Sequence, residues 1–88
     1  MKKYNPRLKK IILEVVDNQL QSHEIPEVKE TFKRLISEGF SNQEAKKMIG
    51  AVLVAEIYYV LKNKRVFDEG KYISAIKRLP ELPGDDYE

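Results

Sequence analysis

The chain has 88 residues, contains no cysteine and carries a formal net charge of +2. Its length leaves room for a single hydrophobic core, and the lack of cysteine excludes disulfides and thiolate metal sites as a means of stabilising that core. The nearly balanced charge is far from the strongly basic composition of a dedicated nucleic-acid-binding protein, so nucleic acid is not the expected partner.

No export or membrane segment is predicted. The basic first residues are followed by an apolar run that Glu14 interrupts too early for a signal peptide. The longest apolar stretch, 48–61, contains Glu56 and falls short of the roughly 20 residues needed to cross a bilayer. We therefore expect a cytoplasmic protein that makes no contact with a membrane.

The first predicted helix covers residues 6–20. Asn5 can accept a hydrogen bond from a free backbone N–H, and the ring of Pro6 already has a helical φ. The following apolar residues recur at the spacing that places them on one face of a helix, and they are Leu8, Ile11, Ile12, Val15 and Val16.

The second predicted helix covers residues 26–38. It begins at Pro26, because proline is tolerated in the first turn of a helix, and it ends before Gly39, the expected left-handed cap. Its apolar stripe consists of Val28, Phe32, Leu35 and Ile36.

The third predicted helix covers residues 42–63 and starts at a capping box formed by Ser41 and Glu44. One face carries Ala45, Met48, Ile49, Val52, Leu53, Tyr59 and Val60, and a second side carries Val54, Ile57, Tyr58 and Leu61. A helix that is apolar all round is normally surrounded by other helices, so we predict that this helix is the central one.

The fourth predicted helix covers residues 68–79, with Asp68 as its cap and Pro80 at its end. Its stripe consists of Tyr72, Ala75, Ile76 and Leu79, and the acidic residues 81–88 are expected to be disordered. The connections are short, so the sequence predicts an all-α fold, a compact four-helix bundle-like single domain over residues 1–80 with a long central third helix.

Residues 6–79 resemble a family of small bacterial all-helical proteins that have no assigned activity. The resemblance is carried by Glu14-Val15-Val16-Asp17-Asn18-Gln19-Leu20, Pro26-Glu27-Val28, Arg34-Leu35, Glu38-Gly39, Glu44-Ala45 and Glu56-Ile57-Tyr58. It implies a shared helical fold and brings no activity with it. Relatives often carry a histidine near the start of the third helix, where this chain has Lys46 and Lys47, so the resemblance implies no metal ligand here.

Few residues can support catalysis. One histidine and no cysteine exclude most pairs of nucleophile and base, and we find no catalytic triad, phosphate-binding loop or metal-ligand spacing. His23 stands in a polar connection, where a solvated side chain is expected. We therefore predict a non-enzymatic protein without a cofactor.

Glu56 falls in the middle of the main apolar face of the third helix, and Gln19 falls in the stripe of the first helix. A buried carboxylate needs a partner, so we predict that Glu56 is hydrogen-bonded to Gln19, a tyrosine or a backbone amide. The structural interpretation is a polar pair of Gln19 and Glu56, or a Glu56 at the rim of the bundle that reaches water. The functional interpretation is a polar pocket for a small ligand or an acid with a raised pKa.

Two surfaces remain as candidate binding sites. The second side of the third helix, Val54, Ile57, Tyr58 and Leu61, is a candidate interaction surface if the short fourth helix leaves it uncovered. The sequence thus favours a protein-interaction module that binds itself, as a homodimer, or another protein through helices 3 and 4. The alternative is weak nucleic-acid binding by the start of the third helix and the basic N-terminus, using Asn42, Gln43, Lys46 and Lys47.

Overall fold

The computed structural model describes residues 6–82 and shows four helices in that range, with no strand among the described residues. The helices are α1 (Pro6–Gln21), α2 (Pro26–Ser37), α3 (Asn42–Asn63) and α4 (Glu69–Lys77). The all-α fold and the helix order are as predicted, and the helix ends differ from the prediction by two residues at most. The predicted cap Asn5 and most of the predicted acidic tail, residues 83–88, lie outside the described residues.

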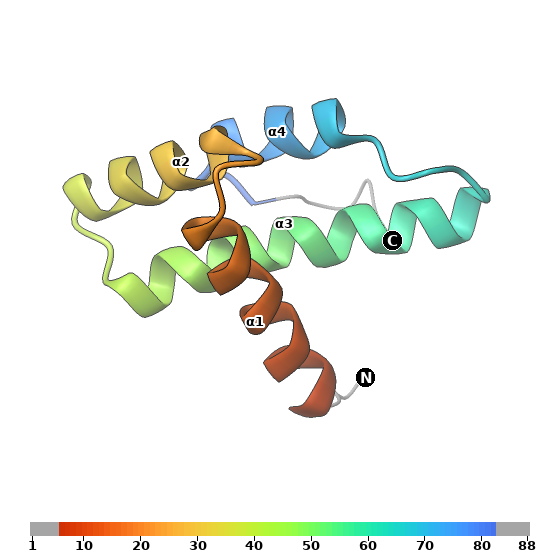
Figure 1. Ribbon diagram of the computed structural model, residues 1–88, viewed down its shortest axis with the longest axis horizontal. Coiled ribbons are helices and arrows are strands. Elements are labelled where there is room, and N and C mark those ends of the chain that lie inside the picture. Colours follow the sequence, from red (N-terminus) through yellow and green to blue (C-terminus); the bar gives the residue numbers. More distant parts are fainter. Residues whose placement is uncertain (1–5, 83–88) are drawn as a thin grey trace.

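α3 is the central helix, because α1, α2 and α4 all pack against it. Figure 1 shows α2 and α4 along one side of α3, while α1 crosses it steeply. The residues of α3 that these helices bury lie mainly on one face, and they are Ala45, Ile49, Gly50, Val52, Leu53 and Glu56.

The turn from α2 into α3 begins with a Schellman motif. Gly39 has a φ of 105°, a backbone conformation that residues other than glycine rarely adopt. The N–H of Gly39 donates to the carbonyl oxygen of Ile36 at 3.0 Å, and the N–H of Phe40 donates to that of Leu35 at 3.1 Å. These bonds satisfy the last carbonyl groups of α2, and Phe40 packs against the core.

Side chains cap the starts of α3 and α4 as the sequence predicts. The Ser41 hydroxyl accepts from the N–H of Glu44 at 3.1 Å, and the Glu44 carboxylate accepts from the N–H of Ser41 at 2.9 Å. At α4, the carboxylate of Asp68 accepts from the N–H of Lys71 at 3.2 Å. Lys64, the residue that follows α3, caps its C-terminus with a left-handed φ of 53°.

The hydrophobic core draws residues from all four helices and from the turn after α4. Its members are Ile12, Val16, Val28, Leu35, Ala45, Ile49, Val52, Leu53, Tyr72, Ala75, Ile76 and Leu79. α1 crosses α3 at Gly50, where a Cβ atom would lie 3.2 Å from Cγ2 of Ile12. The two helices therefore approach closely because α3 has no side chain at the crossing point.

Arg34 of α2 links two helix ends. Its Nη1 donates to the carboxylate of Glu38 at 3.0 Å, and its Nη2 donates to the carbonyl oxygen of Lys77, the last residue of α4, at 3.3 Å. A guanidinium group at a helix C-terminus satisfies a free carbonyl and complements the helix dipole. Arg34 thus helps to hold α4 against α2.

Candidate functional site

Glu56 is the one buried carboxylate in the described part of the chain, with 1% of its surface exposed. Nζ of Lys71, in α4, donates to Oε2 of Glu56 at 3.2 Å. The same ammonium group lies 4.2 Å from the centre of the Tyr59 ring. An ammonium group held between a carboxylate and an aromatic face is stabilised by both, so this contact fixes α4 against α3.

Gln19 accepts a hydrogen bond from the Tyr72 hydroxyl at 2.7 Å, which connects α1 to α4. Tyr72 is fully buried. Burial raises the pKa of Tyr72 to about 12, and the hydrogen bond from its hydroxyl to Gln19 opposes part of that shift. The phenol therefore stays neutral across the physiological pH range.

Glu56 is buried, as its position on the apolar face predicts, but the predicted pair of Gln19 with Glu56 does not form, because each of the two side chains bonds to α4 instead. The partners come from consecutive residues of α4, Lys71 for Glu56 and Tyr72 for Gln19. Sequence reasoning missed Lys71, because a lysine next to a buried tyrosine is ordinarily solvated. These bonds give Gln19 and Glu56 a role in docking α4.

A cavity of about 470 Å³ lies beside this ion pair, under the connection between α3 and α4. Its lining mixes both charge signs with aromatic rings and includes Glu56, Tyr59, Arg65, Phe67, Asp68 and Lys71. The buried carboxylate in this cavity accepts a hydrogen bond from Lys71, which holds it in place.

The predicted interaction residues on the second side of α3 are all exposed. The exposed fractions are 40% for Val54, 38% for Ile57, 51% for Tyr58 and 72% for Leu61. Residues two positions apart on a helix point about 200° apart, so Val54 and Tyr58 both point away from Glu56 and from α4. α4 packs on the opposite side of α3 and contributes no exposed large apolar side chain.

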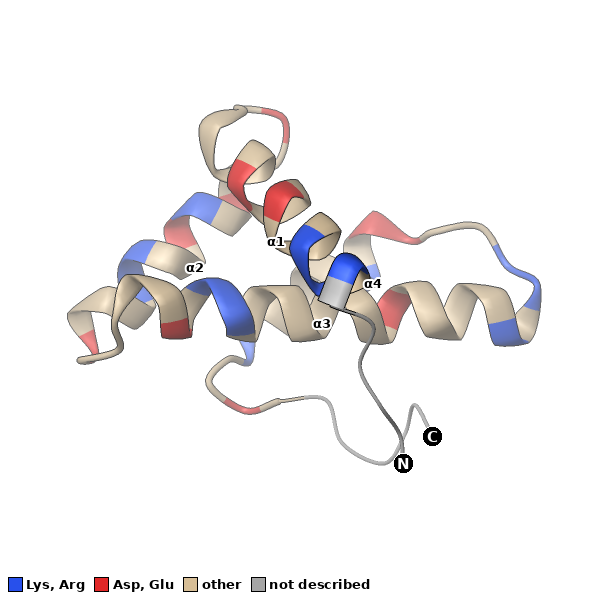
Figure 2. Cartoon of the chain, turned by 90° about the horizontal axis from the view of Figure 1, so that it is seen from below, with Lys and Arg blue, Asp and Glu red and all other residues tan. Residues whose placement is uncertain are grey.

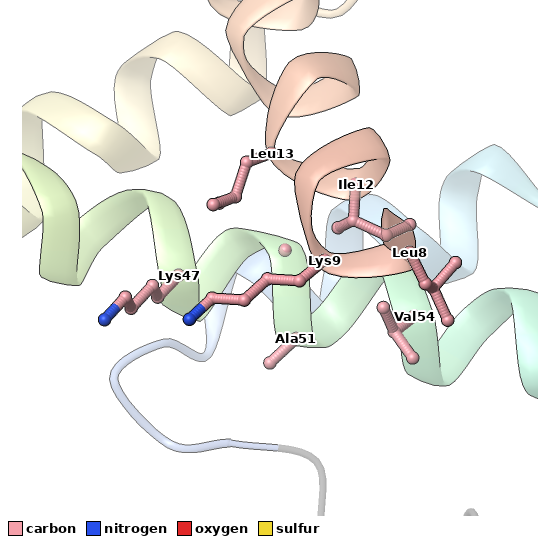
Figure 3. A pocket seen from close by; sticks show the side chains of 8 residues that line it. Leu8, Lys9, Ile12, Leu13, Lys47, Ala51 and Val54 are labelled. Atoms are coloured by element: carbon pink, nitrogen blue, oxygen red, sulfur yellow. The ribbon is translucent and has the colours of Figure 1, made fainter. Parts of the chain in front are cut away.

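α1 adds apolar residues beside this surface. Leu8 and Ile11, near its start, are about half exposed. A groove of about 280 Å³ runs between α1 and α3 where the two helices cross, and Figure 3 shows it from close by. It is lined by Leu8, Lys9, Ile12, Leu13, Lys47, Gly50, Ala51 and Val54.

Two lysines are the charged residues of this groove. Lys9 of α1 and Lys47 of α3 extend to the same side of it in Figure 3. Neither forms an ion pair with a residue of the described range 7–82. The groove therefore combines an apolar lining with two positive charges that no described carboxylate pairs with.

The residues of the predicted nucleic-acid surface lie together at the start of α3. Asn42, Gln43 and Lys47 are exposed, whereas Nζ of Lys46 forms an ion pair with Oδ1 of Asp17, in α1, at 2.8 Å. Figure 2 shows that the first turns of α1 are basic and its later turns acidic. The basic turns of α1 supply Lys9 to the groove, while Asp17 neutralises Lys46.

Residues 6–82 contain neither a cluster of potential metal ligands nor a helix that could cross a bilayer. No group of three or more histidine, cysteine, aspartate or glutamate side chains that could hold a metal ion is found there. His23 is exposed in the connection between α1 and α2. None of the four described helices combines the length and the hydrophobicity that a bilayer-spanning segment requires.

The site that stands out from the fold is thus the outward side of α3 with the adjoining groove on α1, an apolar surface bordered by lysines. Comparison with protein family models, with curated proteins and with solved structures finds no match to this chain.

Proposed function

We propose that this protein is a non-enzymatic interaction module that binds another protein chain through the outward side of α3. We call this the α3 surface and define it by Val54, Ile57, Tyr58 and Leu61. The observation that carries the proposal is that these four side chains are exposed on a helix whose opposite side forms the core. A continuous apolar surface on a small domain marks a place where another molecule binds.

The composition of the α3 surface supports protein binding. Tyrosine is enriched in the centres of protein interfaces, where its ring supplies a large contact area and its hydroxyl finds a partner. Tyr58 stands in the middle of the α3 surface, with Val54 one turn before it and Leu61 about one turn after it. The three side chains form one row along the helix.

The buried polar groups support a structural role rather than catalysis. Glu56 and Gln19 hold α4 in place through Lys71 and Tyr72, and those contacts stabilise the fold. The chain contains no cysteine, which suits the reducing cytoplasm where we expect the module to act.

The proposal is tested by comparing two variants in affinity capture from cell extract followed by mass spectrometry. The variant Tyr58→Ser/Leu61→Ser removes apolar area from the α3 surface, and Val66→Ser removes an apolar side chain that is 87% exposed in the α3–α4 connection. We expect the wild type and Val66→Ser to retain the same proteins and the double variant to lose them. Equal retention by all three would contradict the proposal.

Two solution measurements complete this test. Sedimentation over a range of concentrations shows whether the partner is a second copy of the chain, in which case Tyr58→Ser/Leu61→Ser makes the protein monomeric. Titration with duplex DNA and with RNA at low ionic strength examines the nucleic-acid alternative, whose binding would weaken steeply with salt. If the protein binds either nucleic acid, and Tyr58→Ser/Leu61→Ser binds it equally well, that result would favour the nucleic-acid alternative.

A further inference from the structure

The groove between α1 and α3 adjoins the α3 surface, because Val54 belongs to both. Gly50 and Ala51 contribute little or no side chain, while Leu8 and Val54 form an apolar wall on one side. The α3 surface continues from this groove to Leu61, ten residues beyond Ala51 and so about 15 Å along the helix axis. A helix of about three turns matches that length.

Apart from the capping residue Glu44, the charged side chains that α3 exposes are basic. α3 contains two acidic residues, Glu44, which is engaged in the capping box, and Glu56, which is buried. Lys9 and Lys47 line the groove, and Lys62 follows Leu61 at the other end of the α3 surface. A partner therefore meets an apolar row with cations beside it and no exposed carboxylate from the middle of α3.

This distribution disfavours a second copy of the chain as the occupant. If two copies pack antiparallel about Val54, the centre of the row that runs from Lys47 to Leu61, Lys47 of one copy lies next to Lys62 of the other. If they pack parallel, Lys47 lies against Lys47. Like charges at an interface oppose association, and their repulsion falls as salt is added.

The shape of the groove also favours a protein over a membrane as its ligand. The groove is concave and lies at the crossing of two helices, and Gly50, which lines it, is buried. A bilayer presents a broad surface to its ligands and fills such a groove poorly, whereas the side chains of a helix project far enough to enter it.

We propose that this surface binds an acidic amphipathic helix of another protein, an inference that rests on the function proposed above. The apolar face of the partner helix lies along the row from Ala51 to Leu61, and carboxylates beside that face lie against Lys9 and Lys47. Apolar burial supplies the affinity, and the two lysines select acidic partners over basic ones.

Two synthetic helical peptides of about four turns serve as probes. Both carry leucine at positions i, i+3, i+4 and i+7, flanked in one by glutamate and in the other by lysine. We expect the glutamate peptide to bind the full-length protein about tenfold more tightly than the lysine peptide at low ionic strength, measured by fluorescence anisotropy. Added salt should reduce this preference, because it screens exposed charges.

Charge variants identify the residues that set the preference. Lys47→Glu should weaken binding of the glutamate peptide about fivefold or more and strengthen binding of the lysine peptide, whereas Lys47→Arg should preserve both. Lys33→Glu, an exposed lysine on α2, is the matched control and should change neither. Circular dichroism of all three variants should show an unchanged helical spectrum and Tm.

Several results would overturn this inference. Three concern the peptides, and they are equal binding of the two peptides, binding of neither peptide, and an unchanged preference in Lys47→Glu. Two concern other ligands, and they are tighter binding to phosphatidylserine vesicles than to the glutamate peptide, and self-association that strengthens with salt. The first three leave the proposed function standing as long as Tyr58→Ser/Leu61→Ser loses its captured proteins. If that variant captures the same proteins as the wild type, the result contradicts the proposed function itself.

Discussion

Nζ of Lys71 lies 3.2 Å from Oε2 of Glu56, and the Glu56 side chain is almost fully buried while that of Lys71 remains about one third exposed. A carboxylate in the core costs free energy unless a partner compensates its lost hydration. Lys71 supplies that compensation from α4, so the shortest helix is bound to the central helix by charge as well as by apolar contact.

Removal of Lys71 is expected to destabilise the protein. In Lys71→Met the buried carboxylate loses its ammonium partner, which we expect to lower the free energy of unfolding by about 1–3 kcal/mol. Glu56→Met/Lys71→Met removes both charges and should be more stable than Lys71→Met alone. Urea unfolding of the four members of this mutant cycle measures the coupling, and additive effects would show that the pair contributes little.

Tyr72 predicts a loss of stability at high pH. Its pKa in the folded protein is about 12, above the ordinary value of 10, so the folded state keeps a proton that the unfolded chain releases. The stabilisation is complete below pH 10 and falls by up to about 2.7 kcal/mol as the pH rises to 12.

Tyr72→Phe is the control for this prediction, because it leaves every other titratable group of the protein in place. The difference in unfolding free energy between wild type and Tyr72→Phe should shrink above pH 10, because the variant has no phenol at this position to deprotonate. If the difference in unfolding free energy between the two proteins stays constant from pH 10 up to about pH 11.5, the pKa of Tyr72 is not raised.

The crossing at Gly50 predicts a strong dependence on side-chain size. Gly50→Leu should lower the free energy of unfolding by about 1–3 kcal/mol, because its side chain must displace Ile12 and push α1 away from α3. Gly50→Ala should stay within about 1 kcal/mol of the wild type, since the better helix propensity of alanine offsets the close contact with Ile12. Thermal unfolding measures both, and equal stability of the two variants would contradict a tight crossing.

The two positive φ angles in the described chain predict opposite effects of substitution. Gly39→Ala should destabilise by about 1 kcal/mol, because alanine is strained at a φ of 105°. Lys64→Gly should stabilise by up to about 1 kcal/mol, because it relieves a lysine with a left-handed φ of 53° at the end of α3. Chemical denaturation of both variants, with Lys62→Gly inside the helix as a destabilised control, tests the assignment.

Local sequence signals predicted the helices well because each end depends on few residues. Ser41 and Glu44 fix the start of α3 by hydrogen bonds within four residues, and Gly39 ends the preceding turn. The end of α4 was less predictable. Leu79 belongs to the buried stripe, but it lies in a turn after the helix, so periodicity alone extended the helix too far.

The site was predictable in part. The exposure of Tyr58 and Leu61 follows from helical geometry, because Glu56 and its neighbours fill the opposite face. The groove could not be predicted from the sequence, since the contribution of Leu8 and Lys9 depends on the angle at which α1 crosses α3. No pattern along a chain encodes such an angle, which follows from packing at Gly50.

The two sides of α3 therefore differ in the substitutions that they tolerate. Substitutions toward α4 disturb the core and are limited by folding, whereas Val54, Tyr58 and Leu61 contribute little to the core and can change with little effect on the rest of the molecule. A lineage of such proteins could exchange one binding specificity for another by altering a single row of side chains, while the scaffold beneath it stayed the same.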